Sequence, residues 1–97
     1  MGVKLKDPIS VRAIASRLLQ EKYGMTKVYG RFMRGSMYFT LPNHRGRKLR
    51  ISDHRSYERQ HGDVVVNIIF DQPTIVPDIE YQVEKAFKQY SRWKSKK

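Results

Sequence analysis

The sequence predicts an α+β domain in the order α-β-β-β-β-α, with two helices packed on one face of a mainly antiparallel sheet. Three observations lead to this prediction. Apolar residues recur with a helical period near both ends of the chain, a period of two begins after residue 27, and residues 64–70 form a short run rich in β-branched side chains. A chain of 97 residues suffices for one hydrophobic core, so residues 1–97 are expected to form a single small basic domain, with flexible ends at 1–7 and 93–97.

The first helix is expected over residues 8–23. Asp7 can accept hydrogen bonds from the free N–H groups of the first turn, and Pro8 suits the first helical position because it has no N–H to satisfy. Apolar residues then recur at spacings of three and four, with polar side chains between them. Gly24 is placed to end the helix in the left-handed conformation.

Four strands are expected between the helices. A tight turn at Arg34-Gly35 joins the first two strands as a hairpin, and the third strand, around residues 48–52, alternates apolar with charged side chains. This alternation predicts one basic sheet face that stays in contact with solvent. The run at 64–70 is apolar on both faces, which is typical of a strand that is covered on both sides or lies in the centre of a sheet.

The second helix is expected to begin at Pro77, where Asp78 and Glu80 place negative charge at its positive end. Its apolar residues fall on one side, and its cations fall on the other. The apolar side consists of Ile79, Val83, Ala86, Phe87 and Tyr90, and the basic stripe consists of Lys85, Lys88, Arg92 and Lys96.

The charge balance points to an anionic partner. Lys and Arg number 20 against 9 Asp and Glu, which gives a net charge of +11 that suits a nucleic acid, an anionic membrane surface or an acidic protein. The absence of cysteine excludes a disulfide framework and a cysteine-based zinc site. Because no segment has the length and hydropathy of a membrane span or a signal peptide, we expect a soluble, cytoplasmic protein that does not act at a membrane. We also expect that the protein needs no cofactor or metal.

The strongest functional signal is the segment from Lys27 to Gly62, which holds nine Lys and Arg against two acidic residues, with tyrosines among them. Guanidinium groups that hold phosphates and rings that stack on bases are the usual combination for single-stranded or irregular nucleic acid. A solubilising sheet face with tyrosines at ordinary strand positions is the alternative interpretation. The candidate nucleic-acid-binding residues are Arg31, Arg34, Tyr38, Arg45, Arg47, Lys48, Arg50, Arg55, Tyr57, Lys85, Lys88 and Arg92.

Three histidines, His44, His54 and His61, lie in or next to predicted loops near Asp53 and Asp63. Such a group is compatible with a metal site or a general acid–base pair. Its spacing matches no known ligand or catalytic motif, so we expect surface histidines and assign no catalytic residue.

Three stretches, "EKYGMTKV", "RGSMYFTL" and "GRKLRISDHR", within residues 14–55, resemble the small toxin ribonucleases of the HicA type. The resemblance implies a fold like that of double-stranded-RNA-binding domains and RNA as the substrate. In that family a catalytic histidine follows the Gly-Ser or Gly-Thr pair of the hairpin, whereas here Met37 follows Gly35-Ser36, and a thioether cannot transfer a proton near neutral pH. The second helix also departs from RNA-binding domains, because its acidic start would repel phosphates.

The first functional hypothesis is therefore a non-catalytic nucleic-acid-binding module that favours RNA over DNA. A protein-binding inhibitor or adaptor that docks on an acidic or nucleic-acid-binding site of a larger protein is the alternative. A HicA-like nuclease that uses His54 with Asp53 or His44 is the third hypothesis. Homodimerisation through an exposed edge strand also remains open.

Overall fold

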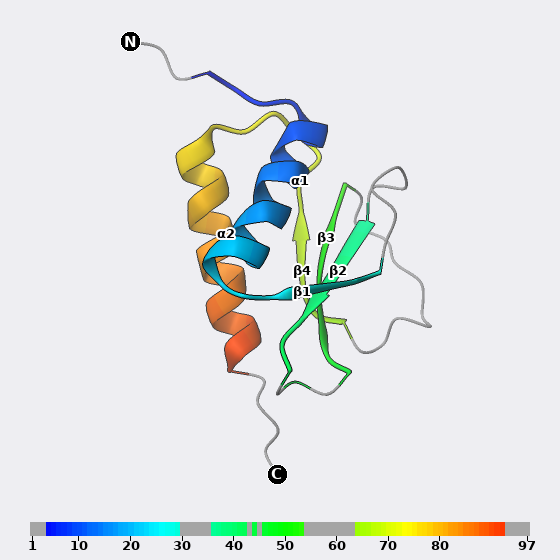
Figure 1. The fold of residues 1–97 in the computed structure, drawn as a ribbon. Helices are drawn as coiled ribbons and strands as arrows, with labels where there is room; N and C mark the ends of the chain where they lie inside the picture. The colour runs from blue at the N-terminus through cyan, green and yellow to red at the C-terminus, as the bar shows by residue number, and fades with distance from the viewer. Residues whose placement is uncertain (1–3, 30–35, 43, 45, 54–63, 93–97) are drawn as a thin grey trace.

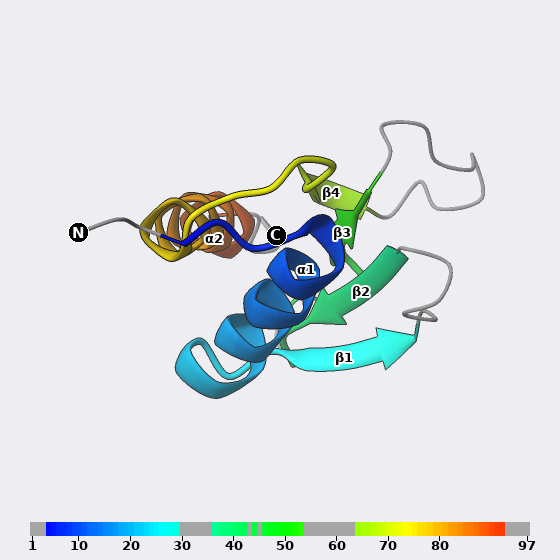
Figure 2. The same ribbon diagram turned by 90° about the horizontal axis from the view of Figure 1, so that it is seen from above.

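The structure, a computed structural model, describes residues 4–29, 36–42, 44, 46–53 and 64–92. It contains helix α1 (Pro8–Arg17), helix α2 (Val76–Ser91) and a four-stranded sheet between them in the chain (Figure 1). Viewed from above, both helices lie on the same face of the sheet (Figure 2). The predicted fold class is confirmed: an α+β domain with a mostly antiparallel sheet.

Helix α1 begins as predicted at Pro8. The carboxylate of Asp7 accepts a hydrogen bond from the backbone N–H of Ser10 at 2.8 Å. The chain continues after α1 as a wider π-helical segment, η1 (Leu18–Lys22), in which the N–H of Tyr23 donates to the carbonyl of Leu18 at 3.2 Å. Gly24 then takes a φ of 69°, so the helical segment ends at the residue that the sequence indicated.

The sheet has the order β1 (Thr26–Tyr29), β2 (Ser36–Thr40), β3 (Lys48–Ser52) and β4 (Val64–Ile69). The first three strands are antiparallel neighbours, whereas β4 runs parallel to β3. The apolar strand β4 therefore lies at an edge, and the prediction that it could occupy the sheet centre is wrong. Apolar composition reports burial of side chains, but the order of strands depends on how the connections cross the sheet.

The core lies between the sheet and the two helices. Alternate residues of β2, β3 and β4 face the apolar sides of α1 and α2, and the rings of Tyr23 and Phe87 stack at 4.5 Å between centroids where η1 meets α2. The buried core residues are Val11, Ala15, Leu19, Met25, Met37, Phe39, Leu49, Ile51, Val66, Ile68, Phe70, Ile79, Val83, Ala86 and Tyr90. The predicted apolar side of the second helix is thus confirmed.

Polar contacts attach α1 and the segment before it to the ends of β3 and β4 and to the connection between β4 and α2. Arg12 is 4% exposed; its Nη1 donates to the carbonyl of Phe70 at 3.3 Å and lies 3.8 Å from the carboxylate of Asp53. This guanidinium joins α1 to the ends of β3 and β4. Lys6 exchanges two backbone hydrogen bonds of 3.0 Å with Thr74, so the segment just before α1 is held rather than free. The expected ends at 1–3 and 93–97 and the turn at Arg34-Gly35 lie outside the described residues.

Candidate nucleic-acid interface

The second face of the sheet is not the exposed basic platform that the alternation predicted. Arg50 is 1% exposed and Tyr38 is 6% exposed, although both point away from the helices. The guanidinium of Arg50 donates to Ser36 Oγ at 3.2 Å and to Asn67 Oδ1 at 3.4 Å, within a network that spans β2, β3 and β4. A cation on a central strand has hydrogen-bonding neighbours on both sides, so both terminal nitrogens of Arg50 have partners without solvent. Tyr38 and Arg50 are therefore corrected from contact residues to buried ones.

Basic residues occur in two segments that meet at one end of the molecule, the turn between β2 and β3 and the last turn of α2 (Figure 1). The link is the hydroxyl of Tyr90, a side chain with no exposed surface. It donates to the carbonyl of Arg47 at 2.6 Å, accepts from the N–H of Leu41 at 3.3 Å and lies 3.1 Å from Thr40 Oγ1. One phenol on α2 therefore holds both sides of the turn.

His44 strengthens the same link. Its ring stacks on that of Tyr90, with 4.5 Å between centroids and 16° between planes. His44 is only 4% exposed, and neither of its ring nitrogens has a hydrogen-bond partner among the described residues. The prediction of a surface histidine is wrong for His44, because it packs as a ring against α2. In this position both ring nitrogens of His44 are buried.

The turn and the helix end together form what we call the basic end, defined by Arg47, Lys48, Lys88 and Arg92. Arg47 and Lys48 are half-buried, whereas Lys88 and Arg92 are exposed. Gly46 has a φ of 76°, a left-handed conformation in which glycine is favoured, so the turn between His44 and Arg47 requires this residue. Lys88 also lies 3.3 Å from Glu84, one turn earlier on α2.

The remaining candidates divide into two groups. Lys85 is exposed on the solvent side of α2, as predicted. Its Nζ lies 5.3 Å from the ring centroid of Tyr81. Arg31, Arg34, Arg45, Arg55 and Tyr57 lie outside the described residues, as do His54, His61 and Lys96.

The charged side chains of α2 are distributed unevenly along its length. Asp78, Glu80 and Glu84 are exposed on the side of its N-terminus, and they are followed by exposed Lys85 and Lys88 and by the C-cap residue Arg92. An anion is thus repelled by the start of α2 and attracted by its end. The acidic start, which the sequence already distinguished from that of RNA-binding domains, confines any phosphate contact of this helix to the basic end.

Met37, which the family resemblance equates with a catalytic histidine, is a core residue. It is 2% exposed and faces the helices from β2. Asp53 lies beside Arg12, and no group of three His, Cys, Asp or Glu side chains that could hold a metal ion occurs in the described part of the chain. Within these residues the structure assembles no acid–base pair with access to a substrate.

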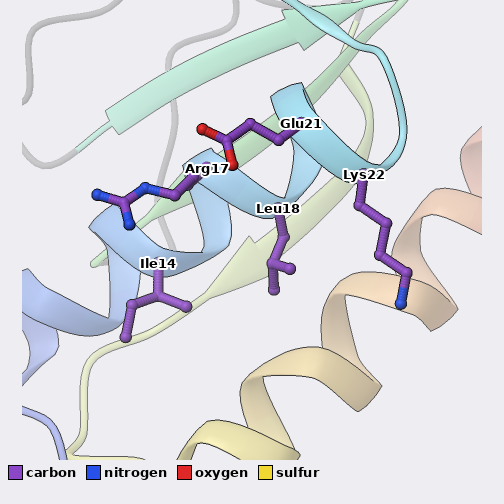
Figure 3. Close-up of a pocket in the computed structure, with 5 residues that line it drawn as sticks. All are labelled: Ile14, Arg17, Leu18, Glu21 and Lys22. Atoms are coloured by element: carbon purple, nitrogen blue, oxygen red, sulfur yellow. The ribbon is translucent and has the colours of Figure 1, made fainter.

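A shallow groove of about 260 Å³ lies beside α1 and η1 (Figure 3). Ile14 and Leu18 project from one side of the helix to form its apolar floor, while Arg17, Glu21 and Lys22 surround it. Its lining comes from one helical segment and lacks the convergent polar groups that orient a small molecule. We assign no ligand to this groove.

Sequence reasoning identified the cations of the basic end but missed the Tyr90–His44 link. The available signal was a tyrosine on the apolar side of the second helix, because a buried tyrosine hydroxyl generally requires a hydrogen-bond partner. Which backbone groups would supply that partner depended on the tertiary arrangement.

No protein-family model, curated protein or solved structure matches this chain. Among the described residues, no helix has the length and apolar character needed to cross a membrane.

Proposed function

We propose that this protein binds nucleic acid through the basic end, by contacts to phosphates rather than to bases. The observation that carries the proposal is the set of hydrogen bonds from Tyr90, because they join basic residues that are about 40 positions apart in the sequence. A surface that gathers cations from two segments gives a stronger local potential than either segment alone.

The mode of contact follows from which side chains are accessible. The preference for RNA rested on tyrosines that would stack on bases, and Tyr38 is buried while Tyr57 lies outside the described residues. Lysine and arginine at a turn and a helix end hold phosphates without reading base edges. We therefore expect binding that depends little on sequence or on the type of nucleic acid.

The first test is fluorescence anisotropy with single- and double-stranded RNA and DNA at several salt concentrations. Four phosphate contacts, one for each cation of the basic end, predict a slope of log K against log salt of about −3.6 on duplex DNA, or about a hundredfold loss of affinity for a fourfold rise in salt. Undetectable binding at the lowest salt would contradict the proposal. In that case the basic end is better suited to an acidic protein surface, which a pull-down treated with nuclease would detect.

Matched charge reversals then locate the interface. The double variant Lys48→Glu with Arg92→Glu alters the basic end. The control, Lys4→Glu with Arg17→Glu, changes the net charge by the same amount, but its substitutions lie before α1 and on α1. The first pair should reduce affinity at least about tenfold more than the second. Equal losses would mean that only net charge matters and that the basic end is not the interface. Far-UV circular dichroism checks that all variants fold.

A further inference from the structure

Within the described part of the chain, one backbone edge of strand β4 has no neighbouring strand. On its other side β4 pairs with β3, and the N–H of Phe70, just after β4, donates to the carbonyl of Ser52 at 2.8 Å. The backbone groups of successive residues point to opposite sides of a strand. The N–H and C=O groups of Ile68, two residues before Phe70, therefore also point toward β3, whereas those of Asn67 and Ile69 point outward. No hydrogen bond to these outward groups exists among the described residues, and neither helix runs along this edge in Figure 2.

The two edges of the sheet differ in how they are protected. Strand β1 is four residues long, carries Lys27 and has a register shift between Lys27 and Tyr29, all of which discourage pairing with another strand. Strand β4 is six residues long, has five β-branched residues and has no charged residue or proline. After one shift at its start, its pairing with β3 is regular from Val66 to Ile69. The β4 edge therefore has the properties of a strand that accepts a partner.

We propose that two copies of this chain pair through the outer edges of β4, antiparallel and about a two-fold axis, to form one continuous eight-stranded sheet. The partner is inferred from the self-complementarity of the strand. With the axis at Asn67, the outward backbone groups of each copy meet those of the other, Asn67 lies opposite Asn67 of the second copy, and Val65 lies opposite Ile69 of the second copy. Pairing at this strand also brings together two chains of charge +11 without placing cations opposite each other on it.

This inference does not rest on the proposed function, and the two can be distinguished by how dimerisation and nucleic-acid binding depend on salt concentration. Dimerisation of two chains of charge +11 is opposed by repulsion that salt screens, so the dimer should be favoured as ionic strength rises. Binding to nucleic acid should weaken over the same range. Either property can therefore fail while the other holds.

The test is sedimentation equilibrium of nuclease-treated protein over a wide range of concentration, with one substitution on each edge. Ile69→Lys places a charge on β4, and Val28→Lys, at a position that is 41% exposed on β1, makes the same change on the other edge. We expect a monomer–dimer equilibrium that Ile69→Lys weakens by about tenfold or more and that Val28→Lys leaves unchanged. A monomer at every concentration, or equal effects of the two substitutions, would overturn the proposal.

Hydrogen exchange of the unmodified protein gives a second readout that does not depend on how Ile69→Lys folds. In the dimer the backbone N–H groups of Asn67 and Ile69 gain acceptors, so their exchange should slow as the protein concentration rises, while the exchange of the Val28 N–H stays constant. A dimer in which the amides of β4 exchange at the monomer rate would have to use another surface, and this result would also overturn the proposal.

Discussion

The stacked rings of His44 and Tyr90 are in opposite hydrogen-bonding states. The hydroxyl of Tyr90 is bonded to backbone groups on both sides of the β2–β3 turn, whereas both nitrogens of His44 are buried without a partner among the described residues. A buried polar atom without a partner reduces stability, and a satisfied one becomes costly only when its partner is removed. The two rings should therefore respond differently to loss of their polar atoms.

We predict that His44→Phe raises the free energy of unfolding by about 1 kcal/mol, because it keeps the stacked ring and removes two unsatisfied nitrogens. Tyr90→Phe should lower it by about 1–3 kcal/mol, since the N–H of Leu41 and the carbonyl of Arg47 lose a partner. Urea denaturation of both variants measures the difference. Destabilisation by His44→Phe would show that the imidazole nitrogens are hydrogen-bonded in solution.

At the scale of elements, the start of α1 is capped by the side chain of Asp7. The hydrogen bond from the N–H of Ser10 lowers the pKa of the Asp7 carboxyl below its ordinary value of 3.8. Because the folded state favours the charged form, this contribution to stability is present above the pKa of the unfolded chain and is lost as pH falls through the folded pKa. The cap therefore stabilises the helix at neutral pH and weakens in acid.

We predict that Asp7→Ala lowers the melting temperature at pH 7 and that the difference from the unmodified protein narrows as pH falls below about 4. Thermal unfolding followed by circular dichroism across this pH range measures the effect. Asp71→Ala, which removes an exposed carboxylate outside any helix start, is the control and should change the melting temperature little. A difference for Asp7→Ala that persists unchanged into acid would contradict a role for its charge.

The strands illustrate what a pattern can indicate about an element. Alternation at residues 36–41 and 48–52 predicted which side chains face the helices, and Phe39, Leu49 and Ile51 are buried there. The same alternation implied an exposed face for Arg50, which instead bonds to Ser36 and Asn67 on its two neighbouring strands. An alternation of apolar and polar residues predicts which residues share a face of a strand, but the exposure of that face depends on the side chains that meet across strands.

At the scale of the whole molecule, the net charge of +11 opposes folding through self-repulsion. Salt and a bound polyanion relieve this repulsion in different ways. Salt screens it generally, whereas a polyanion stabilises the folded state in proportion to its affinity, which salt reduces. Thermal stability therefore gives a global measure of both effects.

We predict that the melting temperature of the free protein rises with ionic strength. An oligonucleotide at about a hundred times its Kd should raise it further at low salt, by about 10 °C, and should have little effect at high salt. Differential scanning fluorimetry with and without duplex DNA measures both changes. An oligonucleotide effect that is equal at low and high salt would exclude phosphate contact as its source.

The sequence by itself determined the fold class, the two helices, the strands and the cations on the outer side of α2. It located the start of α1 at Pro8, and it placed the start of α2 at Pro77, one residue after the observed start at Val76. These are local properties: caps, periodicity and net charge act within a few residues of the chain. Only the tertiary structure decided that β4 lies at an edge, that Arg50 and Tyr38 are buried, and that Tyr90 brings Arg47 and Lys48 to the end of α2. Each of these depends on contacts between segments distant in the sequence, whose geometry exists only once the helices have packed on the sheet.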